Sequence, residues 1–536
     1  MSTTQSSQPM SSTRKPSRQA RRALARQSPA RKAQIQAQEI EELTQEVMAQ
    51  VAAQAAAASL TRACLSEAEV QSWRTDLEAR LAAIQAHPEQ NLGHIEEAVA
   101  VMTKDMLRLL TQRAAQAKAN ATPCQCAHCQ RPLTHEKFLA RGVESRFGHF
   151  VLWRHYGWCA HCQEWQFPAD HALGLASKAC ASPYIQEISA LLVTKMPPEQ
   201  AVPVAQRLGL DLSRCLLDRE AHRQGLKAQA RRSETIAELD SWEGIQRLAG
   251  YTEGPPVQPF TLVIEVDAWN IRERDDWGQT DALREQGKNP ERWHWVYMGT
   301  VFRLEQRGQT AGQRAVITER GYVATRLGLD ALITQLYREA LQRGLAQALR
   351  VLVIADGALW IWNLAQDRFP HAAQRLDLWH AEEHIWAVAH ELYGRGTPQA
   401  RTWVEPLLEQ VRNDETPALI ASLSELKPRL LQSQQDKLQT EIEYLQSNEH
   451  RMKYKAVVQA RKAMKSGKAT AEQIKLANEP LGSGAIESTC RQYQCRFKRT
   501  GQFWTLAGDE ALLCLETFWR NGRWHELYPH AKAALN

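Results

Sequence analysis

Two closely spaced cysteine pairs constrain the fold of this chain more than any other feature. Cys126 and Cys129 form one Cys-x-x-Cys pair, and Cys159 and Cys162 form a second pair after 29 intervening residues. Two residues between thiolates allow a tight knuckle whose backbone amides point at the sulfurs, and two knuckles supply the four sulfurs of a tetrahedral zinc site. A closed site of this kind supports folding and leaves no position for catalysis. We therefore expect a structural Zn²⁺.

The gap between the pairs exceeds the roughly 15–20 residues of compact zinc fingers. Residues 146–156 alternate in polarity like a strand, so a zinc ribbon with a long hairpin over residues 121–170 explains the excess. Alternatives stay open, because Cys124 can compete with Cys126, and the cysteines can form a metal-free cluster or a redox pair. The nearby histidines that can replace a thiolate are His128, His135, His149, His155 and His161. An odd total of 11 cysteines, partly clustered here, argues against a secreted disulfide framework and favours a reducing interior.

The chain before residue 256 is predicted to be mainly helical. Residues 1–38 hold eight Lys or Arg and neither Asp nor Glu, which is typical of a disordered basic arm that tethers DNA or keeps the chain soluble. Residues 39–120 are rich in helix formers with apolar residues three and four apart, which predicts helices suited to self-association. Residues 181–250 fit a helix-turn-helix, with Asp211 or Ser213 as an N-cap and DNA as a possible ligand.

From residue 256 the pattern changes to β-branched runs that alternate with helices. The expected strands cover residues 260–266, 293–304, 315–324, 351–355 and 374–379, and the expected helices cover 329–343 and 358–367. This order predicts an α/β fold over residues 256–379, with helices on the faces of a mixed sheet. Residues 380–479 read as helix almost throughout and are too long for a simple connection. Helices continue over residues 480–525, followed by a tail over 526–536.

Two aspartates follow predicted apolar strands, which is where open sheets place groups that handle ligands. Asp267 follows residues 260–266, and Asp356 follows residues 351–355. With a third carboxylate they can hold two Mg²⁺ ions about 3.5–4 Å apart, an arrangement that cleaves phosphodiesters. Glu487, in the first turn of a helix after a glycine turn, is the best third candidate; Glu510 and Glu516 are rivals. Each of these carboxylates can instead serve as a helix cap.

Two further groups of residues suit DNA chemistry. Asp377 and His380 end the fifth predicted strand, where they can orient a metal ligand or bind a phosphate. The alternative is ordinary strand-end polarity with an N-cap for the next helix. A basic stretch then follows Glu487, and its cations and indole predict a phosphate clamp with a base-stacking side chain. The residues expected to contact DNA are Arg491, Arg496, Lys498, Arg499 and Trp504. The alternative is a solvated basic face with buried aromatics.

Five strings occur in a characteristic order. They are Val266-Asp267-Ala268, Ala355-Asp356-Gly357-Ala358-x-Trp360-Ile361, Leu376-Asp377-x-Trp379-His380, Gly482-Ser483-Gly484-x-x-Glu487-Ser488 and the run from Arg496 to Trp504. Over about residues 122–525 the chain thereby resembles the DDE transposases of bacterial insertion sequences, most closely the ISKra type within a wider Mutator-like group. The resemblance implies a ribonuclease-H-like domain with a helical insertion, and DNA cleavage and joining that depend on Mg²⁺ or Mn²⁺. By motif position it implies Asp267, Asp356 and Glu487 as catalytic metal ligands, with Asp377 and His380 as accessory residues.

The sequence therefore predicts a bacterial DNA transposase, cytoplasmic and associated with the nucleoid. Its partners would be double-stranded DNA at the element ends and the target, and pairing two ends implies a homo-oligomer. No stretch of 18 apolar residues occurs and no apolar segment follows the N-terminal charges, so we expect neither a membrane span nor a secretory signal. Two alternatives stay open: a nuclease of the same fold that cuts without joining, and a non-catalytic, zinc-dependent DNA-binding protein derived from a transposase.

Overall fold

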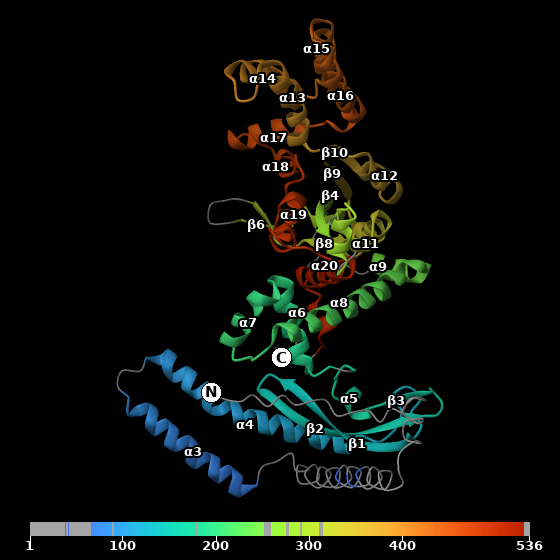
Figure 1. Cartoon of the computed structure of the whole chain (residues 1–536). Coiled ribbons are helices and arrows are strands. Elements are labelled where there is room, and N and C mark those ends of the chain that lie inside the picture. Colours follow the sequence, from blue (N-terminus) through green and yellow to red (C-terminus); the bar gives the residue numbers. More distant parts are fainter. Residues whose placement is uncertain are drawn as a thin grey trace. The chain divides into compact units, whose positions relative to one another are not determined.

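The computed structural model describes residues 66–87, 91–177, 179–250, 259–274, 278–289, 292–309 and 315–529, with three isolated residues before them (Figure 1). It divides into two compact units, residues 1–185 and 186–536. Apart from one residue at its end, the basic arm expected over residues 1–38 lies outside the described residues, as does most of the expected tail. Among the described helices, none has both the length and the hydrophobicity that crossing a bilayer requires.

The first unit combines two helices with an antiparallel hairpin. Its elements are α3 (Glu67–Gln85), α4 (Leu92–Ala121), β1 (Thr134–Ser145), β2 (Gly148–Cys159), β3 (Glu164–Gln166) and α5 (Pro168–Ala172). The strands form one sheet in the order β1-β2-β3, which confirms the expected long hairpin. Helix α4 lies along the hairpin because the buried Gln116 side chain exchanges two hydrogen bonds with the backbone of Trp153 on β2, at 2.7 and 2.9 Å (Figure 1).

The second unit begins with helices that lead into a mixed sheet. The helices are α6 (Pro183–Lys195), α7 (Pro198–Arg207), α8 (Arg214–Ile236) and α9 (Trp242–Gly250). Ser213 caps α8 as expected, because its hydroxyl accepts a hydrogen bond from the Leu216 amide at 3.2 Å. The break between α6 and α7 falls at Pro197, which cannot donate to the preceding turn.

Five strands form the central sheet in the order β10-β9-β4-β5-β8. They are β4 (Thr261–Glu273), β5 (Arg292–Arg303), β8 (Gly321–Thr325), β9 (Arg350–Ala355) and β10 (Ala373–Leu376). Strands β4, β5 and β8 pair antiparallel, whereas β9 and β10 run parallel to β4. Helices α11 (Leu329–Gln342) and α12 (Leu359–Arg368) pack on one face, against residues such as Leu262 and Ile264 of β4. The mixed α/β sheet expected from the sequence is therefore present.

Three expected boundaries were wrong, each because long-range pairing decides where a strand ends. Residues 315–324 are not one strand: β7 (Ala315–Ile317) pairs with β6 (Arg307–Gln309) in a separate sheet, whereas β8 pairs with β5. Asp267 does not end β4, because the antiparallel partner β5 extends the strand six residues further to Glu273. The fifth strand stops at Leu376, because Asp377 already caps the next helix.

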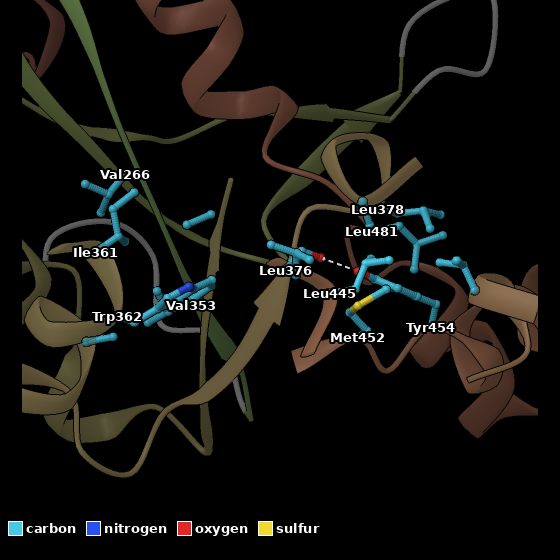
Figure 2. Packing of buried hydrophobic residues seen from close by; sticks show 14 of the residues in the cluster. Val266, Val353, Ile361, Trp362, Leu376, Leu378, Leu445, Met452, Tyr454 and Leu481 are labelled. Atoms are coloured by element: carbon cyan, nitrogen blue, oxygen red, sulfur yellow. Dashed lines mark hydrogen bonds between the residues drawn. The ribbon is translucent and has the colours of Figure 1, made fainter. Parts of the chain in front are cut away.

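Residues 378–527 are mainly helical, as expected. The helices are α13 (Leu378–Tyr393), α14 (Pro398–Arg412), α15 (Thr416–Leu426), α16 (Gln432–Asn448), α17 (Lys455–Lys465), α18 (Ala471–Ala477), α19 (Gly484–Phe497), α20 (Leu506–Arg520) and α21 (Trp524–Leu527). Figure 2 shows that the sheet core continues into them, with Leu445 and Met452 packed near the end of β10. The buried Tyr454 hydroxyl donates to the Leu376 carbonyl at 3.0 Å, which fixes these helices to the sheet (Figure 2).

Candidate functional site

The four cysteines of the two pairs form one compact cluster in the first unit. All four sulfurs lie within 4.8 Å of one another, and Cys126 and Cys159 are fully buried. The Cys126 and Cys162 sulfurs are 3.7 Å apart, and those of Cys129 and Cys159 are 3.5 Å apart. A tetrahedral site with Zn–S bonds of about 2.3 Å has sulfur–sulfur edges of about 3.8 Å. The sulfur spacing therefore fits a structural Zn²⁺ site.

The two knuckles repeat one sequence and one conformation. Cys-Ala-His-Cys-Gln occurs at residues 126–130 and again at 159–163. The final glutamines, Gln130 and Gln163, adopt left-handed backbones with φ of 60° and 57°. In each knuckle the backbone amide of the second cysteine donates to the sulfur of the first. The distance is 3.4 Å from Cys129 to Cys126 and 3.3 Å from Cys162 to Cys159. The repeat is visible in the sequence, and it predicts two equivalent halves of one site more specifically than spacing alone.

The second candidate centre lies just past the point where the parallel pairing of β4 and β9 ends. That pairing runs from Thr261 with Arg350 to Glu265 with Ile354. Asp267 and Asp356 each follow two residues after the last pair. Neighbouring strands lie about 4.8 Å apart. The negative charge of Asp356 acts on the Asp267 carboxyl, so the two carboxylates lie near each other.

Burial and several neighbouring groups shift the pKa of the Asp267 carboxyl. Burial raises its pKa, and the negative charge of Asp356 raises it further; the Ala268 amide at 2.6 Å, the Cys490 thiol and His380 act in the opposite direction. Cys490 lies on α19, one turn after Glu487, and burial together with the charges of Asp267 and Glu487 raises the pKa of its thiol. The charges of Asp267 on β4 and Glu487 on α19 therefore act on the same thiol.

The turn that carries Asp356 is held by the helical segment. The Asp356 side chain accepts the Ala358 amide at 3.0 Å, and its carbonyl accepts the Tyr444 hydroxyl of α16 at 2.6 Å. Gly357 has φ of 102°, and a Cβ there would lie 2.6 Å from that hydroxyl, so no larger residue fits. The His384 ring stacks on Tyr444 with ring centroids 3.5 Å apart. Helices α13 and α16 consequently position the strand-end aspartate.

Asp377 connects β10 with the loop before α19. Its carboxylate is 1% exposed and caps α13 by accepting the amides of Trp379 at 2.7 Å and His380 at 3.4 Å. Its other oxygen accepts the Ser483 amide at 2.5 Å and the Ser483 hydroxyl at 2.7 Å. The expected alternative, a cap for the next helix, is therefore realised. The bonds to Ser483 add a link that the sequence did not indicate.

Glu487 lies in the first turn of α19, as expected, and faces this junction. Its carboxylate, an Asp377 oxygen and a His380 ring nitrogen lie within 4.8 Å of one another. Among the described residues, two other groups of three or more Cys, His, Asp or Glu meet this distance: the four cysteines and a group of Cys124, Glu136 and His155. Glu487 therefore meets the expected accessory pair closely, whereas the oxygens of Asp267, Asp356 and Glu487 do not all lie within 4.8 Å.

One carboxylate that organises the site, Glu265, was not predicted from the sequence. Glu265 is buried on β4, two residues before Asp267 on the same strand face, and accepts the Ile486 amide at the start of α19 at 2.8 Å. Burial raises its pKa to about 8, the nearby Asp377 adds to the shift, and Arg320 and two α19 amides oppose it. A single carboxylate within the apolar run of residues 260–266 was the signal that could have revealed it.

Two of the residues expected to contact DNA have internal partners. Arg496 is 7% exposed and donates to the Val193 carbonyl of α6 at 2.8 and 3.2 Å. The Trp504 indole is half-buried and donates to the Phe497 carbonyl at 2.8 Å, while its ring packs on that phenyl ring. The Arg496 guanidinium therefore fixes α19 to α6, and its contact with DNA stays a prediction.

The other three expected contacts remain accessible to a ligand. Arg491 and Lys498 are exposed, and Arg499 is half-buried with a bond of 3.2 Å to the Gln200 side chain of α7. The Lys498 ammonium lies 5.5 Å from the centre of the Trp293 ring on β5. Cations from the end of α19 thus reach both α7 and the sheet.

Asp267, Asp356 and Glu487 offer the type of donor atom that suits Mg²⁺ or Mn²⁺. Such cations prefer carboxylate oxygens, and a cation would relieve the repulsion that raises the pKa of Asp267. Both oxygens of the Asp377 carboxylate accept hydrogen bonds from the protein, so we assign Asp377 to positioning the start of α19. A search of protein-family models and of curated proteins found no match for the chain.

Proposed function

We propose that the protein is a DDE-type DNA transposase, which cuts and joins phosphodiesters at a site made by Asp267, Asp356 and Glu487. The observation that carries this proposal is the proximity of Asp267 and Asp356, each two residues past the last pair of the parallel neighbours β4 and β9. Two carboxylates near each other, beside a helix that brings a third, match the order and the residue types of the transposase motifs. The proposal depends on these motifs and on this geometry.

The sheet topology supports a ribonuclease-H-like core. Three antiparallel strands, β4, β5 and β8, are followed by two strands parallel to the first, in the order β10-β9-β4-β5-β8. Helix α19 lies on the face opposite α11, with Ala485 packed against Val263 and Ile354. The helices α13–α18 separate the strands from α19 in the chain, as the helical insertion of such a transposase would.

In the proposed reaction, a water oxygen bonds to phosphorus and the bond from phosphorus to the 3′ oxygen breaks. The water loses a proton, and the leaving oxygen takes one up. Joining repeats the exchange with the freed 3′ hydroxyl as nucleophile and a target phosphodiester as acceptor. When bound, divalent cations would activate the attacking oxygen and stabilise the leaving one. Asp267, Asp356 and Glu487 would hold them.

The remaining residues would orient this centre. Asp377 and Glu265 hold the start of α19, so they would set the position of Glu487 relative to the sheet. The His380 ring lies within 4.8 Å of Glu487, where it can contact a phosphate or move a proton. Arg491, Lys498 and Arg499 would supply positive charge for the DNA backbone. The four-cysteine cluster would stabilise a module for recognition of the element ends.

The test uses the full-length protein and a labelled duplex of the DNA that flanks its coding region. We expect Mg²⁺-dependent cleavage, lost in Asp356→Asn while DNA binding is retained. Asp330→Asn is the matched control, because Asp330 is an exposed aspartate in the first turn of α11. Cleavage by Asp356→Asn at the wild-type rate would exclude this centre. Precut ends supplied with supercoiled target separate a transposase, which forms joined products, from a nuclease, which does not.

A further inference from the structure

A second group of metal-binding side chains lies beside the four-cysteine cluster. Cys124, Glu136 and His155 each offer a ligand atom, and the three atoms lie within 4.8 Å of one another. None of them belongs to the four-cysteine cluster. They come from the segment before the first knuckle, from β1 and from β2. A metal at this point would therefore connect three separate parts of the zinc ribbon.

The backbone around Cys124 is fixed by the knuckle that it precedes. The Cys124 carbonyl accepts the Leu133 amide at 3.0 Å, and Gln125 pairs with Pro132 across the same short turn. Cys126 follows in the four-sulfur cluster, so neighbouring segments of one turn supply sulfurs to two different groups. This arrangement answers the competition between Cys124 and Cys126 that the sequence left open: each thiol has its own set of partners.

An irregularity in β1 places Glu136 beside His155. The register changes between Thr134 and Lys137, where β1 has one residue more than β2, and the extra residue makes a β-bulge. His135 has φ of 54° there, a left-handed conformation that is uncommon outside glycine. Beyond the bulge Phe138 pairs with His155, so Glu136 lies two residues earlier on the same strand face. Bulges of this kind redirect side chains, and strained backbone often marks functional positions.

The distances and the exposure suit a transition-metal ion. His155 Nδ1 and Glu136 Oε2 are 3.7 Å apart, close to the edge of about 3.4 Å expected for a tetrahedral zinc site with nitrogen and oxygen ligands. Their side chains are 42% and 46% exposed, so solvent reaches the site. A thiolate and an imidazole favour zinc over Mg²⁺. Three protein ligands leave a fourth position for water.

We propose that Cys124, Glu136 and His155 bind a second zinc ion, which joins the base of the first knuckle to the bulged hairpin. The inference does not depend on the proposed transposase activity. It predicts two zinc ions per chain, one in a closed four-sulfur site and one in an open site with a single thiolate.

The test measures the zinc content of the full-length protein, produced with added zinc and dialysed against metal-free buffer. We expect two zinc ions per chain in the wild type and one in each of Cys124→Ser, Glu136→Gln and His155→Gln. His149→Gln is the matched control: His149 also contacts a glutamate of β1, Glu144 at 3.0 Å, but belongs to none of the metal-ligand groups among the described residues. This control should retain two zinc ions. Far-ultraviolet circular dichroism of every variant checks that the hairpin has folded.

Cobalt substitution distinguishes the two sites spectroscopically. The spectrum of cobalt-loaded wild type minus that of His155→Gln should show a tetrahedral site with a weaker thiolate charge-transfer band than the four-sulfur site. A wild type with one zinc ion would overturn the proposal. So would zinc loss in Cys124→Ser alone, with two ions kept in Glu136→Gln and His155→Gln, because Cys124 would then serve the four-cysteine cluster.

Discussion

The Asp377 carboxylate accepts two hydrogen bonds from Ser483, one from its amide at 2.5 Å and one from its hydroxyl at 2.7 Å. The two residues are 106 positions apart in the chain. Helices α13–α18 lie between these two residues in the chain. The contact therefore holds the end of this helical segment against the end of β10. Gly482 permits the approach, because a Cβ there would lie 2.9 Å from both Asp377 oxygens. The position of Glu487, four residues after Ser483, depends on the contact between Asp377 and Ser483.

Asp377→Asn should destabilise the protein and reduce cleavage. An amide replaces one acceptor oxygen with a donor, so an amide hydrogen would face the Ser483 amide or those that open α13. Leaving a buried polar group unpaired costs about 1–3 kcal/mol, and we expect a decrease of that size in the free energy of unfolding, measured with urea. Asp367→Asn is the control, because the Asp367 side chain is 63% exposed. Equal stability of both variants would contradict the assigned role of Asp377.

Asp267→Asn should stabilise the protein in Mg²⁺-free buffer. The same substitution should abolish cleavage when Mg²⁺ is present. Burial and the charge of Asp356 raise the pKa of Asp267, so its ionised form is less favourable in the folded state than in the unfolded chain. Removing that charge raises the free energy of unfolding. The measurement is urea unfolding at pH 7 with and without Mg²⁺. Wild type should gain about 2.7 kcal/mol when Mg²⁺ is at 100 times its dissociation constant, and the variant should gain much less.

The Asp267 prediction has a control and two contrary outcomes. Asp330→Asn, on the exposed start of α11, should change neither stability nor the response to Mg²⁺. If Asp267→Asn were less stable than wild type without Mg²⁺, the burial and the charge of Asp356 that raise the pKa of Asp267 would not govern its effect on stability. If both proteins gained equally from Mg²⁺, Asp267 would not be a ligand.

Glu265→Gln should remove a pH dependence of stability. Burial raises the pKa of Glu265 from 4.5 to about 8. Its contribution is therefore fully present below pH 4.5 and is lost as the pH rises through 8, with a slope of at most about 1.4 kcal/mol per pH unit. Glutamine is neutral throughout and retains an oxygen for the Ile486 amide. Unfolding curves at pH 5 and pH 8 should show a larger stability loss for wild type than for the variant.

Glu405→Gln, an exposed position on α14, serves as the control for Glu265 and should follow wild type at both pH values. Parallel stability profiles for wild type and Glu265→Gln would show that Glu265 ionises normally. Its burial against the start of α19 would then be wrong.

Removal of zinc should unfold the cysteine end of the hairpin. The four cysteines bury little apolar surface of their own, with only Leu133 in their buried cluster, so the metal supplies most of the stabilisation at this end. The other end has its own apolar core, with Val143, Phe150 and Leu152. Hydrogen exchange after treatment with a chelator should show lost protection at the start of β1 and the end of β2, and retained protection over β4 and β5. Cys159→Ser should reproduce this pattern, and Cys215→Ser, an exposed cysteine on α8, should not. Retained protection at the cysteine end would show that it folds without metal.

Local patterns predicted much of the fold. The apolar run of β9, the amphipathic α11 and the Ser213 cap of α8 follow from residues within one turn or one strand, and the structure agrees with them to within a residue or two. The strand ends near Asp267 and Asp377 did not follow. They depend on the reach of β5 and on a helix cap, and both involve partners distant in sequence.

Residue types and short spacings specify the chemistry available to this protein: two identical cysteine knuckles, aspartates after apolar strands and a glutamate after a glycine turn. Residue type and short spacing are enough for such features, because thiolates and carboxylates have fixed ligand preferences. Which of these groups meet depends on the packing of the folded chain. It brings Asp267 near Asp356, anchors α19 on the buried Glu265 and Asp377, and brings Glu487 to His380. Contacts across more than a hundred residues depend on strand register and packing, which no local pattern encodes.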